Sequence, residues 1–381
     1  MKKIFLCLIL ICLILTGCGK KDEKTVLKEF QDKVNNTDSY YLSGNMELVN
    51  NEDVYTYNIS VSYEKEDHYK IELTNVINDH KQVILRNEEG VYVITPSLNK
   101  SFKFQSDWPY NNSQVYLLSS LLDDISNDED KVFESTDDGY VFTSTVNYPN
   151  NDKLVNQKVY FGKDYLPTKV EVMDTDGNVQ IKMAFDKIDL KTEFNDTYFD
   201  LNSILNTEED NTNNSNIKDK EDNTTNNTNE NNNNNNNNSN SEAQEPSNDN
   251  NQEANSNNQE EDKTKETATI DDIIYPMYLP VNTYLTNQER VSTDDGERLI
   301  LTFTGDSSFV LVEETATYSD SPEIIPTYGS VELIGSSLAV INDNSANWFD
   351  NGIEYYIVSD VMNTSELLQV VRSISVLPVS K

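Results

Sequence analysis

Apolar residues nearly vanish from residues 206–268, and this gap constrains the fold of the whole chain. The segment includes an unbroken run of asparagine over residues 231–238, flanked by Thr, Ser, Glu and Asp. A stretch of this composition cannot bury enough apolar surface to offset the entropy that is lost on ordering. We therefore expect a disordered linker over residues 206–268, with folded regions over residues 19–205 and 269–381.

The N-terminus has the organisation of a secretory leader. Two lysines precede an unbroken apolar run over residues 4–15. That run has the length of a signal-peptide core, whereas a membrane-spanning helix needs about 20 apolar residues. It leads into the sequence L-T-G-C at residues 15–18, which resembles the lipobox of bacterial lipoproteins. We therefore expect residues 1–18 to form a lipoprotein signal peptide with its lipobox.

The lipobox resemblance implies that Cys18 becomes the mature N-terminus and is the lipidation site, carrying a diacylglycerol with acyl chains such as palmitate. Two acyl chains on one residue anchor a protein stably, whereas a single chain gives marginal binding. The resemblance thus implies a lipid-anchored protein on the extracytoplasmic face of the cell membrane. Cys7 and Cys12 lie inside the leader, so no pair of cysteines remains for a disulfide.

The chain is strongly acidic, with a formal net charge of -37 and a pI near 4.2. This charge argues against nucleic acid or anionic lipid head groups as partners, because their phosphates would be repelled. Acidity by itself is also typical of a surface protein that must stay soluble. Contact with the membrane is therefore expected through the lipid on Cys18.

The first folded region begins with a helical period and then changes to a period of two. Val26, Leu27, Phe30 and Val34 recur at helical spacing, which predicts one amphipathic helix. From Tyr40 on, apolar and polar residues alternate, as in antiparallel strands with one face on a core. We expect strands over residues 40–48, 55–63, 69–73, 83–86, 91–95, 102–104, 140–146 and 158–162.

A second helix interrupts these strands. Apolar residues at helical spacing predict it over residues 113–125, with Ser113 as its N-cap. A hairpin then pairs residues 168–173 with residues 179–185 around an Asp-Gly turn. The region is therefore expected to form one long meander, a curved sheet whose apolar face is covered by the two helices.

The end of this region resembles the LolA family of periplasmic lipoprotein carriers. The resemblance rests on L-P-T-K-V-E at residues 166–171, D-G at residues 176–177 and N-D-T-Y-F at residues 195–199. It implies an α+β fold with a half-open antiparallel β-barrel and a helical lid over a hydrophobic cavity. Tyrosines alternate on the predicted inner face, and a buried phenolic hydroxyl requires a hydrogen-bond partner. A closed core and a ligand cavity both remain open interpretations.

The chain also resembles the GerS-like germination and sporulation lipoproteins of the same superfamily. It shares their lipobox, N-terminal helix, Tyr-rich strand pairs and closing hairpin. This resemblance implies an envelope or spore-cortex protein as the partner. A carrier that shuttles between membranes is a soluble protein, whereas this chain is expected to be anchored.

The second region predicts a small antiparallel α+β domain. It opens with Y-P-M-Y-L-P at residues 275–280, where two prolines exclude a helix and a central strand. Hairpins are expected for residues 298–304 with 309–313, for 331–334 with 338–341, and for 348–350 with 354–359. A closing helix is expected over residues 365–374, with Thr364 as its N-cap. The pattern resembles an uncharacterised C-terminal module of Gram-positive surface and sporulation proteins, which implies no particular activity.

No catalytic or metal-binding constellation is visible in the sequence. His68 and His80 are too far apart to predict a zinc site without a cysteine nearby. Serine-hydrolase, Walker and dinucleotide-binding motifs do not occur. D-T-D-G at residues 174–177 is explained by a hairpin turn better than by a calcium loop. Asp123 and Asp124 could serve a glycosidase only if two carboxylates converged in a cleft. We therefore expect no enzyme, no metal and no cofactor.

Three functions compete on these grounds. The first is a non-enzymatic, membrane-anchored lipoprotein that binds a partner protein in the cell envelope, in sporulation, germination or cortex maintenance. The alternative is a lipid or lipoprotein carrier or sensor, with an acyl-chain ligand in the cavity of the first region. The third, a wall-active hydrolase, ranks last because no cleft is implied by any pattern.

Overall fold

The computed structural model describes residues 21–50, 53–105, 108, 113–205 and 268–374. The expected signal peptide, Cys18 and nearly all of the expected linker lie outside the described residues, so what the sequence says of them stays a prediction. In the described part of the chain, no helix is both long and apolar enough to cross a membrane.

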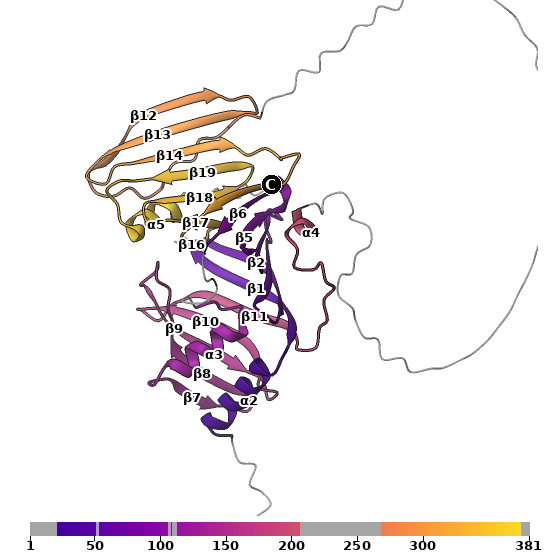
Figure 1. The fold of residues 1–381 in the computed structure, drawn as a ribbon. Helices are drawn as coiled ribbons and strands as arrows, with labels where there is room; N and C mark the ends of the chain where they lie inside the picture. Colours follow the sequence, from indigo (N-terminus) through magenta and orange to yellow (C-terminus); the bar gives the residue numbers. More distant parts are fainter. Residues whose placement is uncertain (1–20, 51–52, 106–107, 109–112, 206–267, 375–381) are drawn as a thin grey trace, which may run out of the picture. The chain divides into compact units, whose positions relative to one another are not determined.

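The first region supplies most of one large, twelve-stranded sheet (Figure 1). From the first region the sheet contains β1 (Ser39–Asn50), β2 (Asp53–Glu64), β3 (His68–Asn75), β4 (Lys81–Asn87), β5 (Gly90–Thr95), β6 (Lys100–Phe104), β7 (Val132–Ser135), β8 (Tyr140–Thr145), β9 (Leu154–Phe161), β10 (Pro167–Asp174) and β11 (Val179–Asp189). The second region adds β15 (Glu323–Thr327).

The sheet is an open meander. Its order is β15-β6-β5-β4-β3-β2-β1-β11-β10-β9-β8-β7, and β1 joins the two halves by pairing with both β2 and β11. Among the described residues the two end strands, β15 and β7, do not pair with each other. The hairpin of β10 and β11 forms as expected around Gly177, which has a φ of +82°. The predicted α+β fold class is confirmed: a half-open sheet, antiparallel except where β15 pairs with β6, with helices beside it.

Alternation of apolar and polar side chains explains why these segments form strands. Along β3 every second residue is buried, and Tyr69, Ile71 and Leu73 all face the core. Cross-strand neighbours on this face also contact one another: the rings of Tyr40 and Tyr63 stack at a centroid distance of 5.0 Å. Such pairs on one face are the unit of sheet stabilisation, so the pattern fixes which face becomes the core.

Two helices cover part of that face (Figure 1). Helix α2 (Glu23–Asn35) starts where the Asp22 side chain accepts the Thr25 amide at 3.0 Å. It buries Val26 and Phe30, as predicted. Helix α3 (Leu118–Asn127) buries four side chains on the same core, namely Leu118, Leu121, Leu122 and Ile125.

The predicted start of this second helix is wrong by five residues. Leu117, not Ser113, is the N-cap of α3, and no side chain caps the helix. Ser113 instead donates its hydroxyl to Asp124 at 3.0 Å and accepts the Asn147 amide at 2.8 Å. Because these bonds tie Ser113 to a distant loop, residues 113–117 run over the core without forming a helix.

The chain after β11 covers the opposite face of the sheet. Residues 190–205, which end in helix α4 (Leu201–Leu205), pack there on β4 and β5. The cluster contains Val83, Leu85, Tyr92, Ile94, Phe194, Tyr198, Phe199, Leu201, Ile204 and Leu205. This second layer explains why β4 and β5 are apolar on both faces, with the 3₁₀ turn η1 (Pro96–Leu98) following β5.

The second region forms a seven-stranded sheet with one helix on it (Figure 1). Its elements are β12 (Thr283–Ser292), β13 (Glu297–Gly305), β14 (Phe309–Thr315), β16 (Ser330–Ile334), β17 (Ser337–Ile341), β18 (Ser345–Asp350), β19 (Ile353–Val358) and helix α5 (Thr364–Arg372). The order is β12-β13-β14-β19-β18-β17-β16, so all three expected hairpins are confirmed. The predicted N-cap is wrong by one residue, because Asn363 accepts the Glu366 amide at 2.9 Å.

Strand β15 links the second region to the first sheet, a pairing that no sequence pattern predicted. It pairs in parallel with β6, and Glu323 lies beside Lys100 with an ion pair of 3.4 Å. The described residues of the first and second regions belong to one compact unit. The boundaries of the four predicted segments themselves stay predictions.

Side chains of β17 and β18 enter the first core. Leu338, Val340 and Phe349 belong to the same buried cluster as the inner face of the large sheet. Phe349 stacks on Phe102 of β6 with ring centroids 5.5 Å apart. The buried Gln82 side chain on β4 accepts the Leu338 amide at 2.5 Å. The concave face of the first sheet is therefore packed against the chain's own second region.

Replacing Gln82 with leucine is expected to lower the free energy of unfolding by about 1–3 kcal/mol, because the Leu338 amide loses its buried acceptor. Gln369→Leu, an exposed change on α5, serves as the control and is expected to have little effect. Urea unfolding followed by circular dichroism measures both. An unchanged midpoint for Gln82→Leu would contradict the contact.

Candidate functional site

In the described part of the chain, a cavity lies between the first sheet and the strands that cover it. Its volume is about 130 Å³. Its apolar lining comes from the sheet (Met46, Leu48, Leu73, Ile84, Leu154, Ile181), from the segment before α3 (Trp108, Val115, Tyr116) and from β16 and β17 (Val331, Leu333, Ile334, Leu338). An engineered apolar cavity of about 150 Å³ holds a benzene molecule. This space therefore fits one ring or a short chain segment, not a whole lipid.

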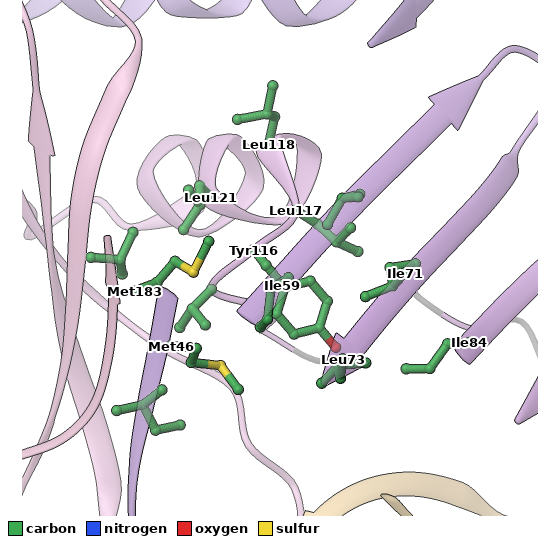
Figure 2. Close-up of a cluster of buried hydrophobic side chains, with 14 of the residues drawn as sticks. Met46, Ile59, Ile71, Leu73, Ile84, Tyr116, Leu117, Leu118, Leu121 and Met183 are labelled. Atoms are coloured by element: carbon green, nitrogen blue, oxygen red, sulfur yellow. The ribbon is translucent and has the colours of Figure 1, made fainter. Parts of the chain in front are cut away.

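The floor of the cavity is continuous with the main core. Figure 2 shows the Tyr116 ring reaching toward the strands that carry Ile59 and Leu73, with Leu121 of α3 and Met183 of β11 beside it. Burial raises the pKa of Tyr116 above its usual range, so its hydroxyl stays neutral. Tyr148, which also lines the cavity, has its pKa raised well above the usual value for the same reason.

Hydrogen bonds hold β16 and β17 over the cavity. The Tyr57 hydroxyl donates to the carbonyl of Gly335, which lies in the turn between these strands. Asn50 donates its side-chain amide to the Arg372 carbonyl at 2.9 Å. Gly335 has a φ of +51°, and a Cβ there would meet the Tyr55 ring at 3.4 Å. The turn is thus fitted closely to the inner tyrosines of the first sheet.

The burial of the inner tyrosines bears on the choice between a closed core and a ligand cavity, which the sequence left open. Tyr55 and Tyr57 are 4% and 1% exposed and face the covering strands. The space between them and the second region is filled by protein side chains, apart from the cavity. The inner face is therefore mostly a closed core with one small cavity.

A polar cluster forms the rim of the cavity. Asn150 donates its side-chain amide to the Glu332 carboxylate at 2.7 Å and to the Ser330 hydroxyl at 3.1 Å. Arg372 donates to the Asn150 carbonyl at 3.5 Å. Burial raises the pKa of Glu332, while the Asn150 bond and the Arg372 charge oppose that shift. The rim offers one acid and one guanidinium but no nucleophile–base pair.

Sequence reasoning missed this rim. Glu332 lies in the alternating strand V-E-L, where its position predicts an outward, solvated side chain. Asn150 lies in a polar loop and Arg372 at a helix end, where each is ordinary. The three come together only because β16 packs against the loop before β9, and no local pattern signals that contact.

The two histidines do not share a site. His68 begins β3 and stacks on Phe199 at a ring distance of 5.6 Å. His80 follows the turn at the other end of β3, where its carbonyl accepts the Asn75 amide. Seven strand residues separate the two ends by about 23 Å. In the described part of the chain, no group of three or more His, Cys, Asp or Glu side chains is placed to hold a metal.

The acid pair of α3 does not form a two-carboxylate cleft. Asp124 accepts the Ser113 hydroxyl at 3.0 Å and the Gln157 amide at 2.9 Å, so both of its oxygens hold structural bonds. Its neighbour Asp123 is exposed on the same helix. Burial raises the pKa of Asp124 to about 6. Asp124 alone is bonded to Ser113 and Gln157, and nothing in the geometry of the two acids favours hydrolysis.

A family model for "Sporulation protein YdcC-like" matches residues 1–199. The sporulation protein YdcC of Bacillus subtilis strain 168 is 31% identical over 366 residues, covering 96% of this chain and 94% of that protein. The chain belongs to the YdcC-like sporulation protein family. The sporulation part of the resemblance inferred from the sequence is thereby confirmed.

Two solved structures are similar in outline. A LolA superfamily protein from Nitrosomonas europaea matches with a TM-score of 0.28 and 12% identity, covering 47% of this chain and 98% of that chain. A chain from the complex of the CwlD amidase with the GerS lipoprotein of Clostridioides difficile matches with a TM-score of 0.21 and 16% identity. It covers 44% of this chain and 95% of that chain.

Replacing Asn150 with alanine is expected to lower the free energy of unfolding by about 1–3 kcal/mol above pH 7, because the partly buried Glu332 carboxylate loses its donor. Asn156→Ala, an exposed change on β9, is the matched control and is expected to be neutral. Chemical denaturation measures both. Equal midpoints for the two variants would show that the rim contact does not hold the strands.

The stability of the chain is also expected to depend on Asp124 between pH 4 and pH 7. Its folded-state pKa of about 6 lies above its ordinary value of 3.8, so folding favours the protonated acid. Stability from this group is full below pH 4 and is lost as the pH rises through 6. The free energy of unfolding of Asp124→Asn should therefore rise relative to that of the wild type as the pH increases from 4 to 7.

This pH comparison has a matched control in Asp130→Asn, an exposed change in the loop that follows α3. Its difference from the wild type should stay constant between pH 4 and pH 7. A constant difference for Asp124→Asn as well would rule out a protonated Asp124 in the fold.

Proposed function

We propose that this chain is a lipid-anchored envelope protein that binds a partner protein during sporulation and has no enzymatic activity of its own. Membership of the YdcC-like sporulation family supports the cellular process. The partner that we infer is an envelope or spore-cortex protein. The proposal includes cleavage of residues 1–18, lipidation at Cys18, and a flexible linker over residues 206–268.

The observation that carries the proposal is the filled concave face. A carrier needs an apolar space that opens to receive cargo. Here Leu338, Val340 and Phe349 of the second region occupy that face, and among the described residues the cavity beside them has a volume of about 130 Å³. The fold is therefore suited to present rigid surfaces to a partner rather than to enclose a lipid.

Binding of an acyl chain is the second candidate, and the apolar lining of the cavity favours it. A chain end could enter beside Leu73, Ile84 and Leu338, with Arg372 at the rim. Denaturing mass spectrometry of the full chain gives its covalent mass, and native mass spectrometry adds any bound molecule. A stoichiometric fatty-acyl increment in the native spectrum alone supports this candidate, and its absence leaves partner binding as the function.

The anchor is tested by Cys18→Ala, with Cys12→Ala as a matched control inside the leader. Because only Cys18 is placed to be acylated, we expect the wild type and Cys12→Ala to incorporate an alkyne-labelled palmitate and to sediment with membranes. Cys18→Ala should lose both properties. Membrane retention of Cys18→Ala at the wild-type level would disprove the anchor.

Partner binding is tested in membranes from sporulating cells of the native host. Chemical cross-linking of the tagged full chain should give a discrete heteromeric adduct, because the anchored chain is expected to be held by its partner. Purified protein should leave peptidoglycan uncut in the same buffer. A chain that stays monomeric on cross-linking, or that cleaves peptidoglycan, would contradict the proposal.

A further inference from the structure

The segment that enters the second region exposes an unusual amount of apolar surface. Within residues 275–285, Met277 is 86% exposed, Val281 82% and Tyr284 64%. Four more large side chains of this segment are also exposed, namely Tyr275, Tyr278, Leu279 and Leu285. Single exposed apolar residues are ordinary, whereas seven within eleven residues of sequence are not, and exposed apolar surface that gathers in one place marks an interaction site.

The same segment leads into a free sheet edge. Strand β12 pairs with β13, and in the described part of the chain its other edge has no strand neighbour. Most of its side chains are exposed on both faces of the sheet. Natural proteins protect long edge strands with charged side chains, proline or bulges. Strand β12 has no lysine or proline; it carries Glu289 and Arg290, and its register shifts between Leu285 and Asn287. Unpaired amide and carbonyl groups along such an edge can accept another strand.

This surface is held in place rather than loose. The buried Glu313 carboxylate accepts the Ile274 amide at 3.2 Å. The Met277 amide donates to the Ser373 carbonyl at 3.2 Å, and the Tyr275 hydroxyl donates to Gln288 of β12 at 3.0 Å. A binding surface that is already ordered loses less entropy when its partner docks.

The net charge of the whole second region favours one kind of occupant. Between residues 269 and 374 the chain has no lysine, and it contains three arginines but seventeen Asp and Glu residues. Arg290 and Arg298 form ion pairs with Glu297 and Glu314 within the sheet. A second copy of the chain, or an anionic membrane, would therefore meet like charge at this surface, whereas a cationic segment would meet opposite charge.

We propose that residues 275–285 and the free edge of β12 form a docking surface for an extended, basic segment of a partner protein. The segment adds to β12 as a strand, places apolar side chains on residues 275–285, and directs Lys or Arg toward the acidic surroundings. This inference rests on the proposed partner-binding function and assigns that function to one surface.

The docking chemistry is tested with a defined probe and the full-length chain. The probe is a synthetic ten-residue peptide of alternating lysine and valine, titrated by fluorescence anisotropy at 50 and 300 mM salt. We expect binding that weakens several-fold at the higher salt. Two peptides are matched controls: one with glutamate for lysine, and one with N-methyl groups on alternate amides, which keeps the charge but cannot pair as a strand. Neither should bind.

Variants locate the site of binding. Met277→Asp and Val281→Asp alter highly exposed side chains, so folding should be preserved while peptide affinity falls about tenfold. Val361→Asp is the matched control, because Val361 is 59% exposed in the same region but lies outside the surface. Equal binding of the N-methylated peptide, or equal affinity for all three variants, means non-specific attraction and overturns the proposal.

The natural partner is tested with a photo-cross-linking amino acid at position 284 or, as a control, at position 328, since both positions hold exposed tyrosines. In sporulating cells, position 284 should give an adduct that maps to a Lys- or Arg-rich segment of another protein, and position 328 should not. A heteromeric adduct from position 328 alone keeps partner binding but overturns this surface. An adduct with a second copy or with lipid also overturns this surface. If neither position gives a heteromeric adduct and the general cross-linking above gives none, both the docking surface and the proposed partner binding are rejected.

Discussion

Burial of the concave face of the first sheet is the constraint on which the structure depends. A half-open sheet exposes the apolar side of every strand until something covers it, and α2 and α3 cover only part of that face. Leu338, Val340 and Phe349 complete the cover, and the Gln82 side chain satisfies a backbone amide at the contact. Without the second region, this buried glutamine and the inner tyrosines would face solvent or an empty cavity.

The covered face distinguishes this chain from the LolA-like layout that its sequence resembles. A LolA-like layout implies a cavity for cargo, yet here the chain supplies its own filling. Glu332 and Arg372 line the remaining space of about 130 Å³, and Asn150 binds Glu332 beside it. The YdcC-like family membership places the chain among sporulation proteins, and the filled interior leaves little room for cargo. Residues 275–285, which lead into the β12 edge, expose several large apolar side chains to solvent.

Local patterns predicted most of the elements, because a period of two or of 3.6 residues survives in each strand or helix. They failed where a distant partner decides the outcome. Strand β15 contains Pro326 and is short, and it forms only because β6 lies beside it. Ser113 has the composition of an N-cap but is bound to Asp124 and Asn147. The rim of the cavity was invisible for the same reason, since its three residues come from separate parts of the chain.

Hydrogen exchange of the full-length chain, followed by mass spectrometry, tests the central claim most directly. If the second region completes the first sheet, the amides of β6 (Lys100–Phe104) should be protected as strongly as those of the interior strand β4. The Leu338 amide should share that protection. Rapid exchange of β6, at the rate of an unpaired edge strand, would contradict the account.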